Sequence, residues 1–171
     1  MDWLLVLLLT LVPGALWVWF FYRQDSHARE PIGRVVLTFG LGMLSILPAA
    51  WAEAPFRDLL ANPPNSFVHL ASMILVVGLV EETSKFLAFY FAAYRSSEFD
   101  EPVDGIVYGS IAGLGFATVE NILYASTFGI AVAPVRAVIA SLAHASFSGL
   151  VGFYAGRVKL LGEPWTVGLY P

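Results

Sequence analysis

The sequence predicts an all-α protein, a single domain of about five helices that each cross a lipid bilayer. Hydrophobic residues make up 58% of the 171 positions and charged residues only 13%, and the mean hydropathy is +0.73, unlike soluble proteins. The apolar residues gather in separate segments, each long enough at about 1.5 Å of rise per residue to cross the hydrocarbon core. We therefore take residues 1–171 as one polytopic transmembrane domain.

The first apolar segment is predicted to be a spanning helix rather than a secretory signal. Asp2 is the only charged residue before Arg23, so the basic stretch of a signal is missing, and the segment is too long for a signal's apolar part. Links rich in charged, proline and glycine residues separate the segments, as in water-exposed loops. In order, the segments are roughly Trp3–Tyr22, Val35–Trp51, Phe67–Tyr94, Gly105–Ala125 and Val135–Gly156, joined by RQDSHAREPIGR, EAPFRDLLANPPNS, RSSEFDEPVD and residues 129–134.

Small residues at four-residue spacing mark one face of the fourth and fifth segments. Such a stripe lets helix backbones approach closely, which is how helices associate in lipid. Glycine is also simply common in membrane helices, so the pattern alone leaves that alternative open. The residues are Gly105, Gly109 and Gly113 in the fourth segment and Ser148, Gly152 and Gly156 in the fifth.

The distribution of positive charge predicts the orientation of the chain. Cytoplasmic loops keep an excess of lysine and arginine, and these residues gather in the first link, the third link and the C-terminal tail. We therefore expect the N-terminus outside and the C-terminus in the cytoplasm. The residues on the predicted cytoplasmic side are Arg23, Arg29, Arg34, Arg95, Arg157 and Lys159, against Arg57 and Arg136 on the other side.

Charge and composition also exclude several functions. The net charge of −4 is spread over the links, so there is no basic surface for nucleic acid. The absence of cysteine excludes disulfides, thiolate metal sites and a cysteine nucleophile.

Ionisable residues interrupt the apolar third and fourth segments far from their ends. These are Glu81, Glu82 and Lys85 in the third segment and Glu120 in the fourth. Each charge at the centre of a membrane helix costs roughly 2.5 to 3.5 kcal/mol, so four unpaired charges would cost on the order of 10 kcal/mol. The sequence therefore predicts that these groups are paired, neutralised or placed in a water-filled cavity.

Polar residues of three segments are predicted to lie at a similar depth in the membrane. Counted from the cytoplasmic ends of their segments at about 1.5 Å per residue, Glu82, Glu120 and His144 lie roughly 18, 22 and 18 Å deep. Three helices are thus predicted to deliver polar groups to a common site. Those helices are the third, fourth and fifth segments, about residues 67–94, 105–125 and 135–156.

Spacing within the third segment pairs its charges. Glu81 and Lys85 are four residues apart and Glu82 and Lys85 three apart, so the lysine can pair with either glutamate. Glu81 and Glu82 point about 100° apart around the helix, so we expect them to have different roles.

Neighbouring residues one turn away complete the predicted site. Phe116 precedes Glu120 by four residues, Ser148 follows His144 by four, and Asn121 adjoins Glu120.

Three interpretations of this cluster remain open from the residues alone. A carboxylate in a low-dielectric site, opposed by a lysine, suits a general base that activates water, with histidine, asparagine or a cation supporting the oxyanion. Glutamate and histidine are also zinc ligands, and a catalytic zinc needs three protein ligands and a water. Buried carboxylates and histidine equally make ion relays in proton- or cation-coupled transporters. A glutamate–lysine pair or an interhelical histidine can also be purely structural.

Three short motifs, each inside its own segment, carry a resemblance to a known family. EETSK matches EExxK, FATVEN matches FxxxEN, and HASFSG resembles a third motif that begins with histidine. Over roughly Val77 to Gly156 the chain resembles the PrsW family of intramembrane proteases, distant relatives of the CAAX-processing and bacteriocin-processing proteases.

The resemblance implies an enzyme that cleaves membrane-anchored proteins, with anti-sigma factors as the best-known substrates. It also implies a multi-pass protein of the prokaryotic inner membrane that acts in regulated proteolysis. Members are described either as metallopeptidases or as glutamic-type enzymes, so a zinc or other divalent cation is one expectation and no cofactor the other. Partners beyond the substrate and the bilayer, including other subunits, are not indicated.

Carried over by position, the motifs assign roles to individual residues. Glu82, or else Glu81, is expected to be the base that activates water, and Glu120 and His144 to position that water, bind a metal or support the oxyanion. A metal would be held by Glu82, Glu120 and His144. The supporting residues are Lys85, Asn121, Phe116 and Ser148.

The sequence departs from the family at its C-terminal end. Longer members continue into a further helix with another histidine motif, whereas this sequence ends at Pro171. If that histidine is needed for hydrolysis, we expect this chain to keep the fold without full activity.

Overall fold

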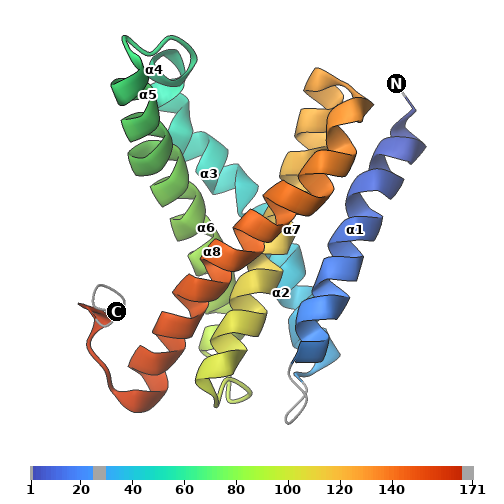
Figure 1. Ribbon diagram of the computed structural model, residues 1–171. Helices are drawn as coiled ribbons and strands as arrows, with labels where there is room; N and C mark the ends of the chain where they lie inside the picture. The colour runs from blue at the N-terminus through green and yellow to red at the C-terminus, as the bar shows by residue number, and fades with distance from the viewer. Residues whose placement is uncertain (1, 25–29, 167–171) are drawn as a thin grey trace.

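A computed structural model describes residues 2–24 and 30–166, and this part of the chain forms helices and no strands (Figure 1). The all-α prediction is therefore confirmed. His27 and Arg29 from the first link lie outside the described residues. The α-helices are α1 (Trp3–Gln24), α2 (Ile32–Leu44), α3 (Ile46–Glu53), α4 (Arg57–Ala61), α5 (Ser66–Ser72), α6 (Leu79–Phe89), α7 (Pro102–Phe128) and α8 (Ala133–Leu161).

Five helical stretches of the described chain are long and apolar enough to cross a membrane, which confirms the predicted number. Some of them contain more than one helix, because short breaks separate α2 from α3 and α5 from α6. The stretches are Trp3–Arg23, Ile32–Ala61, Ser66–Tyr94, Pro102–Phe128 and Ile130–Leu161.

The second stretch differs from the prediction in two ways. It is broken at Ser45, whose hydroxyl donates to the carbonyl oxygen of Gly42 at 2.7 Å. The break follows from Pro48, which has no N–H to donate back into the preceding turn. The predicted loop after Trp51 is also wrong over much of its length, because α3 continues to Glu53 and is followed by a 3-10 turn and α4.

The third stretch contains two π-helical turns on either side of the EETSK motif. Met73–Gly78 lies between α5 and α6, and Tyr90–Tyr94 follows α6. Turns of this kind are rare and often occur at functional sites.

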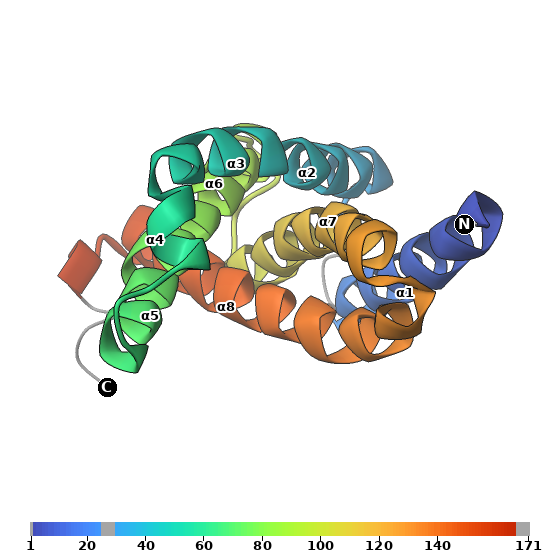
Figure 2. The ribbon, with the colours of Figure 1, turned by 90° about the horizontal axis from the view of Figure 1, so that it is seen from above.

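Helix α7 lies at the centre of the bundle, with α1, α2, α6 and α8 around it (Figure 2). In its most apolar stretch 72% of the residues are buried inside the protein, whereas the other four spans reach at most 28%. The remaining apolar surface is left to the lipid. The FATVEN motif is therefore carried by the most enclosed helix.

Glycines bring the backbones of α7 and α8 into contact, which confirms the close packing predicted from the small residues. A Cβ atom added at Gly105 would meet the carbonyl oxygen of Gly152, and one added at Gly152 would meet that of Gly105. One turn on, a Cβ at Gly109 would meet the carbonyl oxygen of Ser148. No residue but glycine fits these positions without moving a helix.

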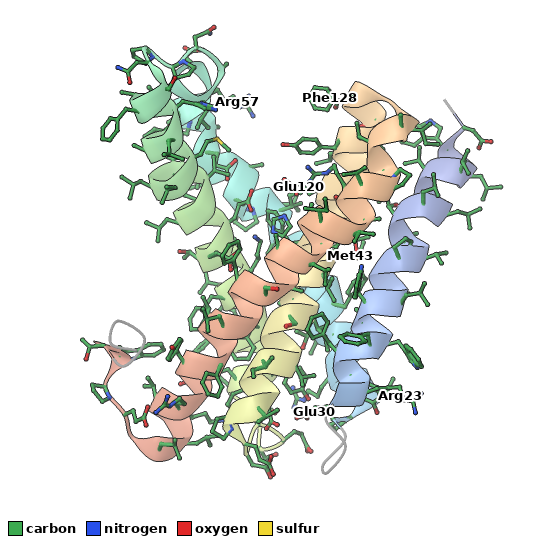
Figure 3. The ribbon with its side chains drawn as sticks, in the orientation of Figure 1. Arg23, Glu30, Met43, Arg57, Glu120 and Phe128 are labelled. Carbon is green, nitrogen blue, oxygen red and sulfur yellow. The ribbon has the colours of Figure 1, made fainter. Side chains whose placement is uncertain are left out.

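The links alternate between the two ends of the bundle as predicted. Arg23 and Glu30 lie at the lower end in Figure 3, Arg57 and Phe128 at the upper end, and Glu120 between them. Helix α1 begins at the upper end and α8 ends at the lower end (Figure 1). That the lower end faces the cytoplasm remains a prediction from the positive charges.

Toward the upper end the bundle divides into two arms (Figure 1). Helices α3, α4 and α5 lie in one arm, and the upper parts of α7 and α8 lie with α1 in the other. A cavity of about 410 Å³ is lined by residues of α3, the π-turn before α6, α6 itself and α7. The cavity therefore lies between the two arms.

Candidate active site

The ammonium group of Lys85 is the centre of the buried polar cluster. Its Nζ lies 3.0 Å from Glu81 Oε2, 2.9 Å from Glu82 Oε1 and 2.7 Å from His144 Nδ1. The lysine is only 1% exposed, so its charge is balanced by these groups rather than by water. Helix α6 supplies both carboxylates through the three- and four-residue spacing, and α8 supplies the imidazole.

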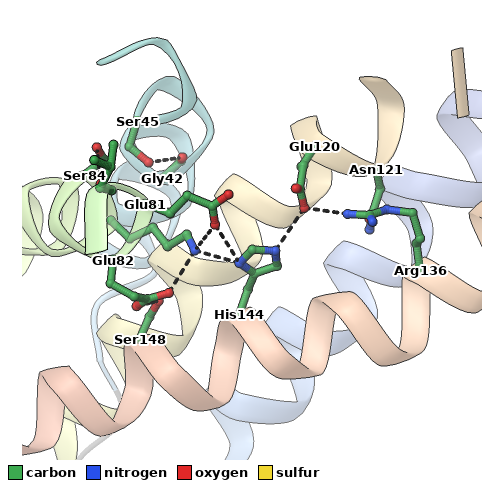
Figure 4. Close-up of polar contacts among 12 residues, drawn as sticks. Gly42, Ser45, Glu81, Glu82, Ser84, Glu120, Asn121, Arg136, His144 and Ser148 are labelled. Carbon is green, nitrogen blue, oxygen red and sulfur yellow. Dashed lines mark hydrogen bonds and ion pairs between the residues drawn. The ribbon is translucent and has the colours of Figure 1, made fainter. Parts of the chain in front are cut away.

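His144 connects this centre to α7. Its Nε2 lies 3.0 Å from Glu120 Oε2, while Nδ1 faces the lysine. An ammonium group can only donate hydrogen bonds, so Nδ1 accepts, and Nε2 carries the hydrogen and donates to Glu120. The imidazole is thus held as one defined tautomer between a cation and a carboxylate (Figure 4).

Arg136 binds the same carboxylate oxygen of Glu120 as His144 does. One terminal nitrogen of its guanidinium forms an ion pair with Glu120 Oε2, and Nε donates to Asn121 Oδ1 at 2.9 Å. The guanidinium carbon also lies 3.6 Å from the centroid of the Tyr124 ring. Asn121 in turn donates to Ser141 at 3.1 Å.

Two further side chains complete the cluster. Ser148 donates from its hydroxyl to Glu82 Oε2 at 2.8 Å, so Glu82 is held by α6 and α8 together. The Phe116 ring lies under the lysine, with its centroid 4.3 Å from Nζ, and 5.5 Å from the His144 ring centroid.

The structure thus brings together all eight residues that the sequence singles out, in one network across α6, α7 and α8. They are Glu81, Glu82, Lys85, Phe116, Glu120, Asn121, His144 and Ser148.

The two glutamates of EETSK face different surroundings. Glu81 lines the 410 Å³ cavity together with Glu120, whereas Glu82 lines a much smaller space beside Ser148 and Phe86. The different roles expected from their angular separation therefore correspond to different environments. Of the three glutamates in the predicted site, Glu81 and Glu120 line the space that could admit a substrate, and Glu82 does not.

Residues 30–170 match the family described as PrsW family intramembrane metalloprotease. The chain belongs to this family. The resemblance carried by the three motifs is therefore confirmed, and the PrsW match extends further toward both ends of the chain than the motifs did. No solved structure shows a significant match to the chain.

Curated PrsW relatives are similar over most of this chain. It is 38% identical over 149 residues to Protease PrsW of Geobacillus kaustophilus (strain HTA426), covering 86% of this chain and 64% of the relative. For Protease PrsW of Bacillus subtilis (strain 168) the identity is 34%, covering 90% and 68%, and for that of Clostridioides difficile (strain 630) it is 29%, covering 91% and 67%. The chain spans about two thirds of the length of these relatives.

The PrsW family description includes a metal, and a metal requires side chains whose oxygen and nitrogen atoms are free to coordinate it. Glu82, Glu120 and His144 are ligand types suited to zinc, but Glu82 bonds to Lys85 and Ser148, and Glu120 to Arg136 and His144. The point on which two carboxylates and the imidazole converge is occupied by the lysine ammonium. Among the described residues no three or more histidine or acidic side chains are grouped to hold a metal ion. In this arrangement the residues do not fit a metal.

The sequence reasoning missed two residues near the site, Arg136 and Glu53. Arg136 was predicted to be one of the positive charges at the outer end of the bundle. The signal that could have identified it is the EN motif of the PrsW family, because Glu120 and Asn121 are hydrogen-bond acceptors that require a donor near that end of the membrane. Glu53 was predicted to lie in a loop, whereas α3 carries this residue to the wall of the cavity.

Proposed function

We propose that this chain is an intramembrane endopeptidase that hydrolyses a peptide bond of a membrane-anchored protein. The observation that carries the proposal is the opening of the Glu81–Lys85–His144–Glu120 network onto the cavity between the two arms. Membership of the PrsW family supports peptide hydrolysis as its chemistry. The proposed substrates are anti-sigma-factor-like proteins cut in regulated proteolysis, in the plasma membrane of a prokaryotic cell.

The proposed base is Glu81. The motif argument prefers Glu82, but the lining of the cavity supports its neighbour, which can reach a water placed there. The Glu81 carboxylate takes a proton from this water as the water oxygen attacks the carbonyl carbon of the substrate. The carbon–nitrogen bond then breaks, and the same proton passes to the departing nitrogen.

The other residues prepare the groups that react. Lys85 forms ion pairs with both glutamates, and Glu82, which accepts a hydrogen bond from Ser148, fixes the position of the lysine. Glu120, which lines the cavity, positions the water from the α7 side, and His144 holds Glu120 in place through the hydrogen bond from Nε2. No step in this scheme needs a metal.

A proton- or cation-coupled transporter is the alternative use of such a cluster. Transport needs a polar path that continues from the cluster toward both ends of the bundle. Below the cluster, the described part of α7 is packed into an apolar core that contains Phe89, Val107 and Ile111. This packing favours hydrolysis in a site that opens at one end.

The test is cleavage of a tagged single-span substrate by the purified chain in proteoliposomes, followed by mass spectrometry of the products. Loss of a general base lowers rates about 100-fold or more, so Glu81→Gln should abolish detectable cleavage. Glu82→Gln should retain a measurable fraction, because the base remains.

The matched control is Glu98→Gln, an exposed carboxylate in the link before α7, which should cleave like the unmodified chain. Full activity of the Glu81→Gln protein would overturn the assignment of the base. Ion-driven flux through liposomes without any proteolysis would support the transporter instead.

A further inference from the structure

Glu53 is a carboxylate inside the bundle that the proposed hydrolysis does not use. It is the last residue of α3 and lines the cavity between the arms. Its Oε1 is buried and has no hydrogen-bond partner among the described residues. Burying such an oxygen without a partner costs free energy, so a ligand that supplies the missing donor is favoured here.

The cavity around Glu53 combines apolar walls with acidic groups. Helix α3, the π-turn with α6, and α7 each supply one wall, and most of the side chains are aliphatic or aromatic. The apolar lining residues are Ile46, Ala49, Ala50, Met73, Val77, Phe116, Leu123 and Tyr124, and the acidic ones are Glu53, Glu81 and Glu120.

The three carboxylates differ in their pairing. Glu81 is paired with Lys85, and Glu120 with Arg136 and His144. The described residues include no lysine or arginine in the lining of the cavity, and none of them forms an ion pair with Glu53. Glu53 is therefore the acidic group of the cavity that has no cationic partner among the described residues, and a cationic occupant would supply one.

We propose that this cavity binds a lysine or arginine side chain of the substrate, with its charged end at Glu53. These side chains lay an aliphatic stem along apolar surface and keep a cationic head for a polar partner, which matches the two kinds of wall. The volume of about 410 Å³ lies within the usual range for binding pockets.

The position of the cavity gives this binding a consequence for cleavage. Glu81 and Glu120 line the same space, so a basic side chain held at Glu53 places the neighbouring peptide bonds beside the proposed reacting groups. Glu53 is then a specificity residue that selects which bond is cut. This inference depends on the proposed function for its substrate class, although the binding itself can be measured separately.

Binding of short fluorescent peptides to the purified chain in detergent tests the proposal. The probes are apolar peptides with a central lysine, norleucine or glutamate, measured by fluorescence anisotropy. Close charge pairs in a partly buried site are worth about tenfold or more in affinity, so the lysine peptide should bind at least about tenfold tighter than the norleucine peptide. Glu53→Gln should remove this difference, and Glu53→Lys should prefer the glutamate peptide.

The matched control is Asp58→Asn, an exposed carboxylate in α4 at the same end of the bundle, which should keep the lysine preference. Equal binding of the lysine and norleucine peptides, or a preference that survives Glu53→Gln, overturns the proposal. The reversed preference of Glu53→Lys cannot arise from misfolding. Selective binding without cleavage would contradict only the proposed function, whereas cleavage without a lysine preference would contradict only this inference.

Discussion

At the scale of single residues, Lys85 controls the stability of the site, because three groups depend on its charge. Removing one partner of a buried ion pair leaves the others uncompensated and costs about 3 to 5 kcal/mol. We therefore expect Lys85→Met to lower the free energy of unfolding by about that amount and to abolish cleavage. Thermal unfolding in detergent measures the first effect.

Adding Glu81→Gln and Glu82→Gln to Lys85→Met should recover much of the lost stability, because no unpaired charge then remains next to position 85. Arg95→Met is the control, since Arg95 is exposed at the lower end of the bundle. A Lys85→Met protein as stable as the parent would show that the cluster is not held by this charge.

Arg136 is the second residue with a distinct prediction. It holds Glu120 and Asn121 with one planar group, which a lysine cannot reproduce. Arg136→Lys should keep most of the stability, since a lysine retains the positive charge that pairs with Glu120. Its kcat should fall about tenfold or more as Glu120 loses its orientation.

The separation of kcat from KM tests this role of Arg136. If Arg136→Lys and Arg136→Gln both change only KM or only the melting temperature, Arg136 does not position Glu120 for the reaction.

The sequence was sufficient to predict which eight residues lie together in one cluster, but it did not predict all of their partners. Spacing of three and four residues fixed the pairing of Lys85 with Glu81 and Glu82, because that pairing lies within one helix. The contact between Arg136 and Glu120 joins two different helices, and spacing within one helix does not predict it. The place of Glu53 in the cavity depends on how far α3 extends beyond its apolar segment, and hydrophobicity alone does not define that end.

At the scale of elements, the packing of α7 on α8 depends on Gly105 and Gly152. A side chain at either position would meet the partner backbone, which cannot move aside as a flexible side chain does. Overpacking of this kind costs about 1 to 3 kcal/mol. We expect Gly105→Ala to lower the melting temperature in detergent and to reduce cleavage, because His144 moves with α8.

The control for this substitution is Gly40→Ala in α2, where an added Cβ meets nothing within 4 Å. It should leave stability unchanged or raise it slightly, since alanine is the better helix former. Equal effects at Gly105 and Gly40 would mean that the close approach of α7 and α8 is not needed.

The breaks within the second and third spans mark the limit of sequence reasoning at this scale. The π-turn at Met73–Gly78 lies in a run, MILVVG, in which every residue is apolar or glycine. A change of helical period leaves no trace where all faces are alike. Pro48 indicated that the helix could be interrupted near Ser45. Because Pro48 lies inside an apolar run, however, the sequence was equally compatible with a kink in one helix and with the start of a second helix.

At the scale of the whole molecule, the orientation of the bundle decides from which side a substrate reaches the cavity. The cavity lies between the arms at the end that carries Arg57 and Phe128 (Figure 3). The distribution of positive charge predicts that the opposite end faces the cytoplasm. Together these predict that cleavage takes place in the outer half of the membrane.

Single cysteines test this orientation directly, because the chain contains none of its own. Asp58→Cys in α4 and Glu98→Cys in the link before α7 place exposed thiols at the two ends. A membrane-impermeant maleimide should label Asp58→Cys in intact cells and Glu98→Cys only after the membrane is opened. The reverse labelling pattern would show that the bundle has the opposite orientation. The cavity would then lie in the cytoplasmic half of the membrane, and substrates would be cut from that side.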